Sequence, residues 1–294
     1  MKKLQKKYSI AAFIDILGYK DLIQNEAIER EIELFNDLKI TIDLALASTV
    51  EITKTILTHF DNKYGDSERI SNRLNVKQFS DNIYFSFDYE DQNENDLLFG
   101  IYIISNISLT YQRLMLAKGY FVRGGIGMGL NMVDKNFIFS TALIDAVETE
   151  KDTIYPRITL HTKLKNKFLL TENHPLKDLL KGTLIQDWAD NIFLNPFNQT
   201  TRNIKAYETL SANDFQEIEQ VLTNKQKRLI NKINKEFSFI PNDKQFNSVS
   251  RAHISKKIKK YKGRNQSIYE KYLWSRNFLN WVENRRSDLL FRYI

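Results

Sequence analysis

The segment "KQFSDNIYFSF", residues 77–87, contains two alternating apolar stretches that are separated only by Ser80, Asp81 and Asn82. Alternation with a period of two predicts β-strands, and the short polar interruption predicts a tight hairpin turn between them. An aspartate suits such a turn for local reasons, because its side chain hydrogen-bonds nearby backbone groups. Asp81 taken alone therefore indicates a turn. A functional interpretation requires a second carboxylate at the same place.

The elements around this hairpin follow a regular order. A buried strand is predicted at residues 8–19, and a long helix with an apolar period near 3.6 at residues 25–59. The hairpin at 74–87 is followed by a helix at 96–117 and by a glycine-rich strand at 119–130. The order β–α–β–β–α–β is that of the ferredoxin-like split arrangement. We expect an α+β fold in which the first and third strands lie together at the centre of an antiparallel sheet.

The second carboxylate is Asp15, which lies inside the apolar first strand. An unpaired charge in such a strand costs several kcal/mol, so a functional role for Asp15 is favoured. We expect the first and second strands to be neighbours. The end of the first strand, with Asp15, would then lie close to the hairpin that carries Asp81.

Two carboxylates at one sheet edge repel each other and require a cation. The chain has no cysteine, and its four histidines have no ligand spacing, so Mg²⁺ or Mn²⁺ with oxygen ligands is expected. Two such ions form the clamp for in-line phosphoryl transfer. A nucleoside triphosphate is then the natural substrate. Because the sequence has no GxxxxGKS or GxxxxGKT P-loop, the metal ions must hold much of the phosphate.

The composition is that of an ordinary globular protein, with 42% hydrophobic and 12% aromatic residues among 294. The lack of cysteine excludes disulfides and cysteine nucleophiles and fits a reducing compartment. The apolar stretch near the N-terminus is interrupted by Asp15 and Lys20, and the longest apolar run, residues 97–109, is too short to span a bilayer. We expect a cytoplasmic protein without a membrane partner.

The net charge of +7 is unevenly distributed. Residues 201–294 contain 20 Lys and Arg against 9 Asp and Glu, with the densest basic run at residues 255–264. Two helical patterns, at 214–237 and 268–286, are separated there by a polar segment with Pro241. We therefore divide the chain into a catalytic domain, residues 1–200, and a basic helical region, residues 201–294. Because no nucleic-acid motif accompanies the charge, we expect a solvated basic face and no stable nucleic-acid partner.

From its first strand to about Leu160, the chain resembles a class III nucleotidyl cyclase domain. "FIDILGYKD" at residues 13–21 resembles the first metal motif of that family, and "VKQFSDNIYFSF" at 76–87 resembles the second. "VRGGIGMG" at 122–129 is similar to the family's Arg-x-Gly-Ile-x-x-Gly strand. "TALIDAVETE" at 141–150 lies where the family has a helix with Asn and Arg.

This resemblance implies a role for each matching residue. Asp15 and Asp81 would hold two ions of Mg²⁺ or Mn²⁺ per site, with the carbonyl of Ile16 as a further ligand. Arg123 would bind the β and γ phosphates and act in catalysis with the two aspartates. Lys77 matches the position that reads the base. The residues whose backbone would touch the phosphates are Gly18, Tyr19 and Lys20.

Within the family, the chain looks closest to the pyrimidine cyclases of the Pycsar anti-phage system. The shared features are "FSDNI", "VRGGI", "YPRI" at 155–158, "DWADNIFLNPF" at 187–197 and "KYLW" at 271–274. The resemblance implies conversion of UTP or CTP, with UTP favoured, to the 3′,5′-cyclic monophosphate and pyrophosphate. It also implies a homodimer with sites between the subunits, to which the second subunit supplies Lys77. The product would activate a separate effector protein.

One departure from the family concerns the helix at 141–150. The positions of its Asn and Arg match Ile144 and Glu148 here, so another residue must supply positive charge to the developing transition state. The candidates are Arg123, Lys20, Arg157 and a C-terminal lysine or arginine. We include Arg157 among the substrate-binding residues, although it could also belong to a plain turn.

Three alternative functions stay open: a purine cyclase, a degenerate cyclase, and a nucleic-acid-binding protein that uses the basic region 201–294. A purine cyclase would agree with Lys77, but the expected Asp or Cys partner near Phe137 is not apparent. A degenerate cyclase could bind nucleotide as a regulatory module, as the missing Asn and Arg suggest. The glycines within 124–129 either allow tight packing of a helix on the strand or let phosphate approach closely.

Overall fold

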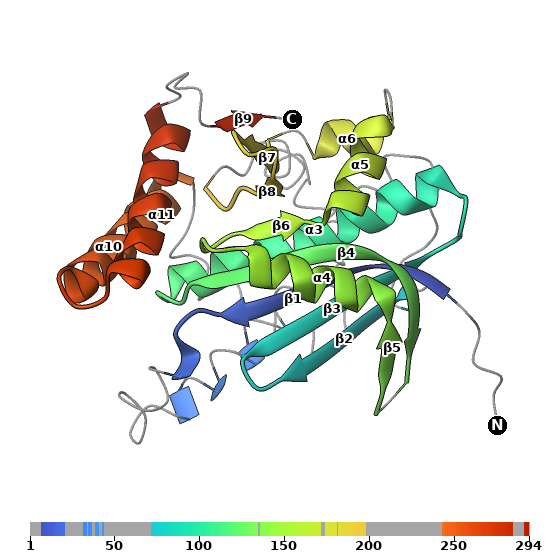
Figure 1. Ribbon diagram of the computed structural model, residues 1–294, viewed down its shortest axis with the longest axis horizontal. Helices are drawn as coiled ribbons and strands as arrows, with labels where there is room; N and C mark the ends of the chain where they lie inside the picture. The colour runs from blue at the N-terminus through green and yellow to red at the C-terminus, as the bar shows by residue number, and fades with distance from the viewer. Residues whose placement is uncertain are drawn as a thin grey trace, which may run out of the picture.

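The computed structural model describes residues 7–20, positions 32–33, 35–36, 39–40 and 43, and residues 72–134, 136–171, 174–180, 182–197, 243–284 and 291–293. Within these residues the strands form one mixed sheet in the order β2-β3-β1-β4-β6-β8-β7-β9, with β5 paired to β4 (Figure 1). The described positions between 32 and 43 are helical, and the rest of the helix predicted at 25–59 lies outside the described residues. The helix predicted at 214–237 also lies outside them.

The centre of the sheet is β1, Lys7–Ile16, which pairs in antiparallel fashion with β3, Asn82–Tyr89, and β4, Val122–Val133. The remaining strand of the predicted hairpin, β2, Leu74–Phe79, pairs with the outer side of β3. The prediction that the first and third strands lie together is therefore confirmed. The prediction that the first and second strands are neighbours is wrong, because β3 lies between them.

Two helices cover opposite faces of this part of the sheet (Figure 1). On one face lies α3, Glu94–Ala117, whose N-terminus is capped by Asn93 and whose buried apolar residues join those of β1 and β3 in the main core. On the other face lies α4, Thr141–Asp152, capped by Ser140. Together they give the α+β architecture that the order of elements predicts.

Beyond α4 the chain extends the sheet on the β4 side. The first of these strands, β6, pairs parallel to β4, and the later ones are antiparallel to one another. The remaining elements are β5, Ile138–Ser140; β6, Ile158–Leu160; α5, Thr162–Leu170; α6, Pro175–Leu179; β7, Leu184–Asp187; β8, Ile192–Leu194; and β9, Phe291–Tyr293. Among the described residues, no helix is long and apolar enough to cross a membrane.

Two C-terminal helices, α10, Asp243–Tyr261, and α11, Gln266–Asn284, lie together at one end of the sheet (Figure 1). They pack in a second apolar cluster in which Phe278 of α11 contacts Phe193 of β8, with ring centroids 5.3 Å apart. The prediction of a polar segment between the two C-terminal helical patterns is wrong, because α10 occupies most of that segment. The division of the chain at residue 200 stays a prediction, although both sides of it contribute to this cluster.

Candidate functional site

Asp15 and Asp81 meet at the end of β1. Asp15 pairs in register with Asn82 of β3 on one side and with Arg123 of β4 on the other. Because β1 and β3 are antiparallel, the end of β1 lies beside the start of β3, directly after the turn that carries Asp81. In that turn Ser80 has a φ of 55°, and the Asn82 amide donates a 3.2 Å hydrogen bond to the Asp81 carboxylate.

Asp15 ionises with difficulty in this environment. Burial, the largest cause, and the negative charges of Asp81 and Glu150 together raise its pKa to about 6, while the Arg123 guanidinium opposes them. A side-chain hydrogen bond with Asp81 acts in the same direction as the charges, so the two carboxyl groups face each other. The site therefore gathers more negative charge than its own residues neutralise.

Arg123 connects the aspartate pair to α4. Its Nε lies 3.4 Å from the Asp15 carboxylate and 2.5 Å from Oε1 of Glu150. The Glu150 side chain is only 7% exposed, and burial raises its pKa although Arg123 and Lys151 oppose that shift. Sequence reasoning missed Glu150, since nothing in the local pattern of the helix predicts that its last turn reaches Arg123.

The glycines of β4 bring α4 close enough for this contact. A Cβ at Gly125 would lie 2.1 Å from the Ala146 carbonyl oxygen, and one at Gly127 would lie 2.5 Å from that of Ala142. Both distances are far below van der Waals contact. These contacts favour the packing interpretation of the two glycines. The close approach of strand and helix is what places Glu150 beside Arg123.

A further cation comes from the C-terminal region. Lys271 of α11 is half-buried, and burial lowers its pKa, as does the positive charge of Arg123, while Asp15 and Glu150 oppose the shift. The sequence predicts only an unspecified C-terminal lysine or arginine, and Lys271 is a C-terminal lysine on which the charges of Arg123, Asp15 and Glu150 act. No local signal distinguishes Lys271 from the other lysines of the basic region.

The proposed phosphate-contacting residues follow β1 directly. Gly18 has a φ of +76°, which a non-glycine residue rarely adopts, and a Cβ there would meet nothing within 4 Å. Tyr19 is partly buried against the main core, whereas Lys20 is exposed. The exposed turn at Gly18 is therefore open to approach next to Asp15.

Lys77 lies on the same face of the sheet as Asp15. It pairs with Tyr84, which in turn pairs with Phe13, and strand residues two apart point to the same side. The Asp134 carboxylate accepts hydrogen bonds from backbone amides, which lower its pKa, and the charge of Lys77 lowers it further. Lys77 lies on the edge strand β2, two strands away from β1. Within one subunit it is aligned with Phe13 and not with Asp15.

Arg157 is engaged in a buried ion pair. Its guanidinium lies 2.6 Å from the Asp187 carboxylate, and both side chains are 8% exposed. It also lies over the rings of Phe193 and Trp274, at 4.8 and 5.6 Å from their centroids. Burial alone would raise the pKa of Asp187, but the hydrogen bonds from Arg157 and Asn191 lower it. These contacts favour a structural role, and a substrate-binding role for Arg157 stays a prediction.

A second acidic group lies on the α4 side of the sheet. The ligand atoms of Asp145, Glu148 and His161 lie within 4.8 Å of one another. The ammonium of Lys163, however, lies 2.9 Å from the Asp145 carboxylate and already neutralises it. The contact with Lys163 makes this group less favourable for a cation, and the metal site at Asp15 and Asp81 stays a prediction.

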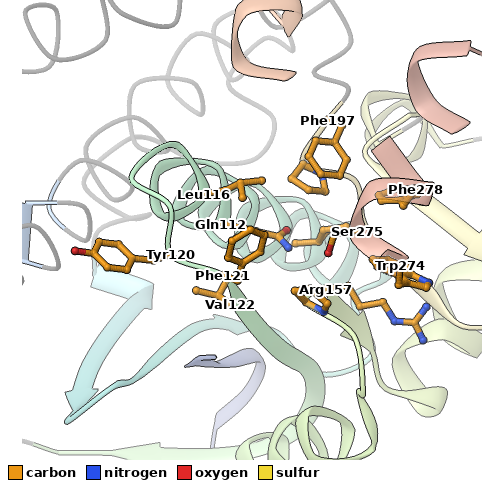
Figure 2. A pocket seen from close by; sticks show the side chains of 13 residues that line it. Gln112, Leu116, Tyr120, Phe121, Val122, Arg157, Phe197, Trp274, Ser275 and Phe278 are labelled. Carbon is orange, nitrogen blue, oxygen red and sulfur yellow. The ribbon is translucent and has the colours of Figure 1, made fainter. Parts of the chain in front are cut away.

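A small pocket separates α11 from the start of β4 (Figure 2). Its unfilled space is about 360 Å³, part of which is open to solvent. Val122, the neighbour of Arg123, lines it together with Gln112 of α3 and Trp274 and Ser275 of α11. The aromatic contacts thus hold α11 beside the start of β4, and some space between the two stays unfilled.

Comparison with solved structures finds similarity to nucleotide cyclases. The chain is similar to the adenylyl cyclase CyaB from P. aeruginosa, with 13% identity, coverage of 67% of this chain and 97% of that one, and a TM-score of 0.40. It is similar to the guanylyl cyclase Cya2, with 11% identity, coverage of 56% and 79%, and a TM-score of 0.34. It is also similar to a class III adenylyl cyclase-like ATP-binding protein from Pseudomonas aeruginosa, with 11% identity, coverage of 80% and 44%, and a TM-score of 0.41.

No protein-family model matches the chain, and no curated protein matches it. Because the structural similarities have such low identities and TM-scores, we base the function on the residues of this chain and their geometry.

Proposed function

We propose that this protein is a nucleotide cyclase, which converts a nucleoside triphosphate into its 3′,5′-cyclic monophosphate and pyrophosphate. The observation that carries the proposal is the facing pair of Asp15 and Asp81 with the Arg123 guanidinium beside it. Carboxylates held together at a sheet end form a binding site for a cation, and a guanidinium next to them suits the phosphates that the cation accompanies.

The donor set fits Mg²⁺ or Mn²⁺. Asp15, whose pKa burial and the charge of Asp81 raise, forms together with Asp81 a site for hard divalent ions, and the Ile16 carbonyl is next to Asp15 in the chain. When bound, such ions supply activation of the ribose hydroxyl and neutralisation of charge on the phosphates. Asp15 and Asp81 would hold them. The number of ions and the choice between Mg²⁺ and Mn²⁺ belong to the proposal.

The remaining residues would orient the nucleotide. Arg123 is positioned to donate hydrogen bonds to phosphate oxygens, since Asp15 and Glu150 hold its guanidinium at the start of β4. Lys77 would read the base of a nucleotide bound mainly by the second subunit. The exposed turn after β1 would offer backbone amides to the phosphates. Its residues are Gly18, Tyr19 and Lys20.

The finer proposal is a pyrimidine cyclase with UTP or CTP as substrate, acting in the cytoplasm in anti-phage defence through a separate effector. It is supported by the similarity of several short motifs to the Pycsar cyclases and by the two α4 positions that lack the Asn and Arg of purine cyclases. Those positions, Ile144 and Glu148, are exposed on α4. A homodimer is part of the same proposal.

The experiment is product identification. The purified protein is incubated with each of the four ribonucleoside triphosphates and Mn²⁺, and the products are analysed by mass spectrometry with the Asp81→Ala variant in parallel. Cyclic UMP or cyclic CMP that is lost in the variant is expected. Cyclic AMP or cyclic GMP would support a purine cyclase. Nucleotide binding without any cyclic product would favour a regulatory module.

A further inference from the structure

α11 packs against the segment that leads into β4. The Tyr272 ring packs edge-on against Phe121, with centroids 4.8 Å apart, and the Phe121 carbonyl accepts a 2.8 Å hydrogen bond from the amide of Leu17. Leu17 is two residues beyond Asp15, and Phe121 is two residues before Arg123. This part of α11 is therefore next to the end of β1 and the start of β4. Figure 1 shows the C-terminal helices at the same end of the sheet as the end of β1.

The rotation of α11 is fixed by its aromatic contacts. The ring of Trp274 stacks on Tyr155, with centroids 4.9 Å apart and planes 8° from parallel, and it packs edge-on against Phe193. Trp274, Ser275 and Phe278 all line the pocket against the sheet (Figure 2). Residues three, four and seven positions apart share one face of a helix, so Lys271 lies on this same sheet-facing side.

The surroundings of Lys271 are charged. Arg123, Asp15 and Glu150 are the groups whose charges act on its ammonium, which places the lysine among the residues of the proposed site. Holding a half-buried lysine beside a second cation is unfavourable without an anion between them. Asp15 and Glu150 supply negative charge already, and a phosphate would supply more.

In purine cyclases the helix that corresponds to α4 carries the cationic residue, whereas α4 of this chain has no cation at the matching positions. On α4, Ile144 is 55% exposed and Glu148 is acidic, so neither position can supply positive charge. Arg123 is engaged by two carboxylates, and Arg157 by Asp187. Lys20 is exposed on the turn after β1, whereas Lys271 is a partly buried cation of the described residues that lies near Asp15 and could act together with Arg123.

Resting on the proposed function, we propose that Lys271 is a catalytic residue whose ammonium contacts the phosphates of the bound nucleotide. In the reaction a bond forms between the ribose 3′ oxygen and the α phosphorus, the bond from that phosphorus to the bridging oxygen breaks, and pyrophosphate leaves with the electron pair. The hydroxyl proton passes to solvent. Lys271 donates hydrogen bonds to the phosphate oxygens on which negative charge grows and exchanges no proton itself.

The test compares Lys271→Met, Lys271→Arg and the control Arg276→Met, which removes a charge from the exposed side of the same helix. Thermal unfolding establishes that each variant is folded. With the accepted triphosphate and Mn²⁺, Lys271→Met is expected to lower kcat roughly 100-fold with a smaller change in KM. Lys271→Arg should restore part of the activity, and Arg276→Met should match the wild type. An unchanged kcat in folded Lys271→Met would overturn the proposal.

A second measurement does not depend on turnover. Binding of inorganic pyrophosphate in the presence of Mn²⁺ is measured by calorimetry, and Lys271→Met is expected to weaken it about 10-fold while Arg276→Met leaves it unchanged. If the wild type makes no cyclic product but its pyrophosphate binding depends on Lys271, the cyclase proposal fails and the phosphate contact stands. If pyrophosphate does not bind, or binds equally well to Lys271→Met, the role of Lys271 is refuted whatever the enzyme produces.

Discussion

The ionisation of Asp15 couples the site to stability. Its pKa in the folded protein is about 6, against an ordinary value of 3.8, because of burial and the neighbouring negative charges. The folded state therefore binds more protons than the unfolded state between these two values. The free energy of unfolding must fall as the pH rises through this window, and the penalty is fully present above it.

Replacing Asp15 by Asn should remove this penalty. Without divalent cations at pH 8, Asp15→Asn is expected to raise the free energy of unfolding by about 1–3 kcal/mol, and at pH 4 to change it little. Urea unfolding at the two pH values measures the difference. An equal change at pH 4 and pH 8 would contradict the assignment. The variant should have no cyclase activity.

Divalent cations should act on the same pair. Millimolar Mn²⁺ is expected to raise the Tm of the wild type by several degrees, because a ligand that binds only the folded state stabilises it. Asp81→Asn should abolish this response. Asp145→Asn is the matched control, since it removes a carboxylate from the second acidic group and should leave the response intact. A response lost only in Asp145→Asn would transfer the metal site to that group.

At the scale of elements, the contact between α4 and β4 determines the geometry of the site. The small residues of β4 let the helix approach until Glu150 reaches Arg123, which itself contacts Asp15. A displacement of α4 would therefore be transmitted to the end of β1. Activity and stability should be lost together when this contact is opened.

Gly125→Ala tests this coupling. Its Cβ would lie 2.1 Å from a backbone oxygen of α4, so we expect a loss of about 3 kcal/mol in urea unfolding together with a large loss of activity. Gly263→Ala is the control. Its φ is +73° but nothing lies within 4 Å of the added atom, so it should cost only about 1 kcal/mol and leave activity unchanged. Similar losses in both variants would exclude overpacking as the cause.

At the scale of the whole molecule, several large apolar side chains are exposed on the sheet and its helices. Phe79, at the end of β2, is 47% exposed, Phe137 is 65% exposed and Ile144 of α4 is 55% exposed. Exposed large apolar groups are typical of a surface that a partner covers. Together with Lys77, which lies two strands away from Asp15, they agree with the proposed homodimer.

Mixing two variants tests the shared site. If Asp81 and Lys77 act from different subunits, Asp81→Ala and Lys77→Ala should each lower activity severely. Co-expressed, half of the dimers would be mixed and each would contain one intact site, so activity should return to about a quarter of the wild-type value. Activity that stays at the level of the single variants would place both residues in one subunit or exclude the dimer.

Sequence patterns alone predict the local elements, and they bring Asp15 near Asp81 although they make the wrong strand the neighbour of β1. Period-two alternation and the hairpin at Asp81 predict β2 and β3. Because β1 and β3 are antiparallel, the end of β1 with Asp15 lies beside the turn that carries Asp81. The tertiary packing alone places β3 between β1 and β2, brings Glu150 into contact with Arg123 and Lys271 near it, and pairs Arg157 with Asp187. The reason is physical: periodicity and turn chemistry act over a few neighbouring residues, whereas these contacts depend on how helices distant in the sequence pack against the sheet.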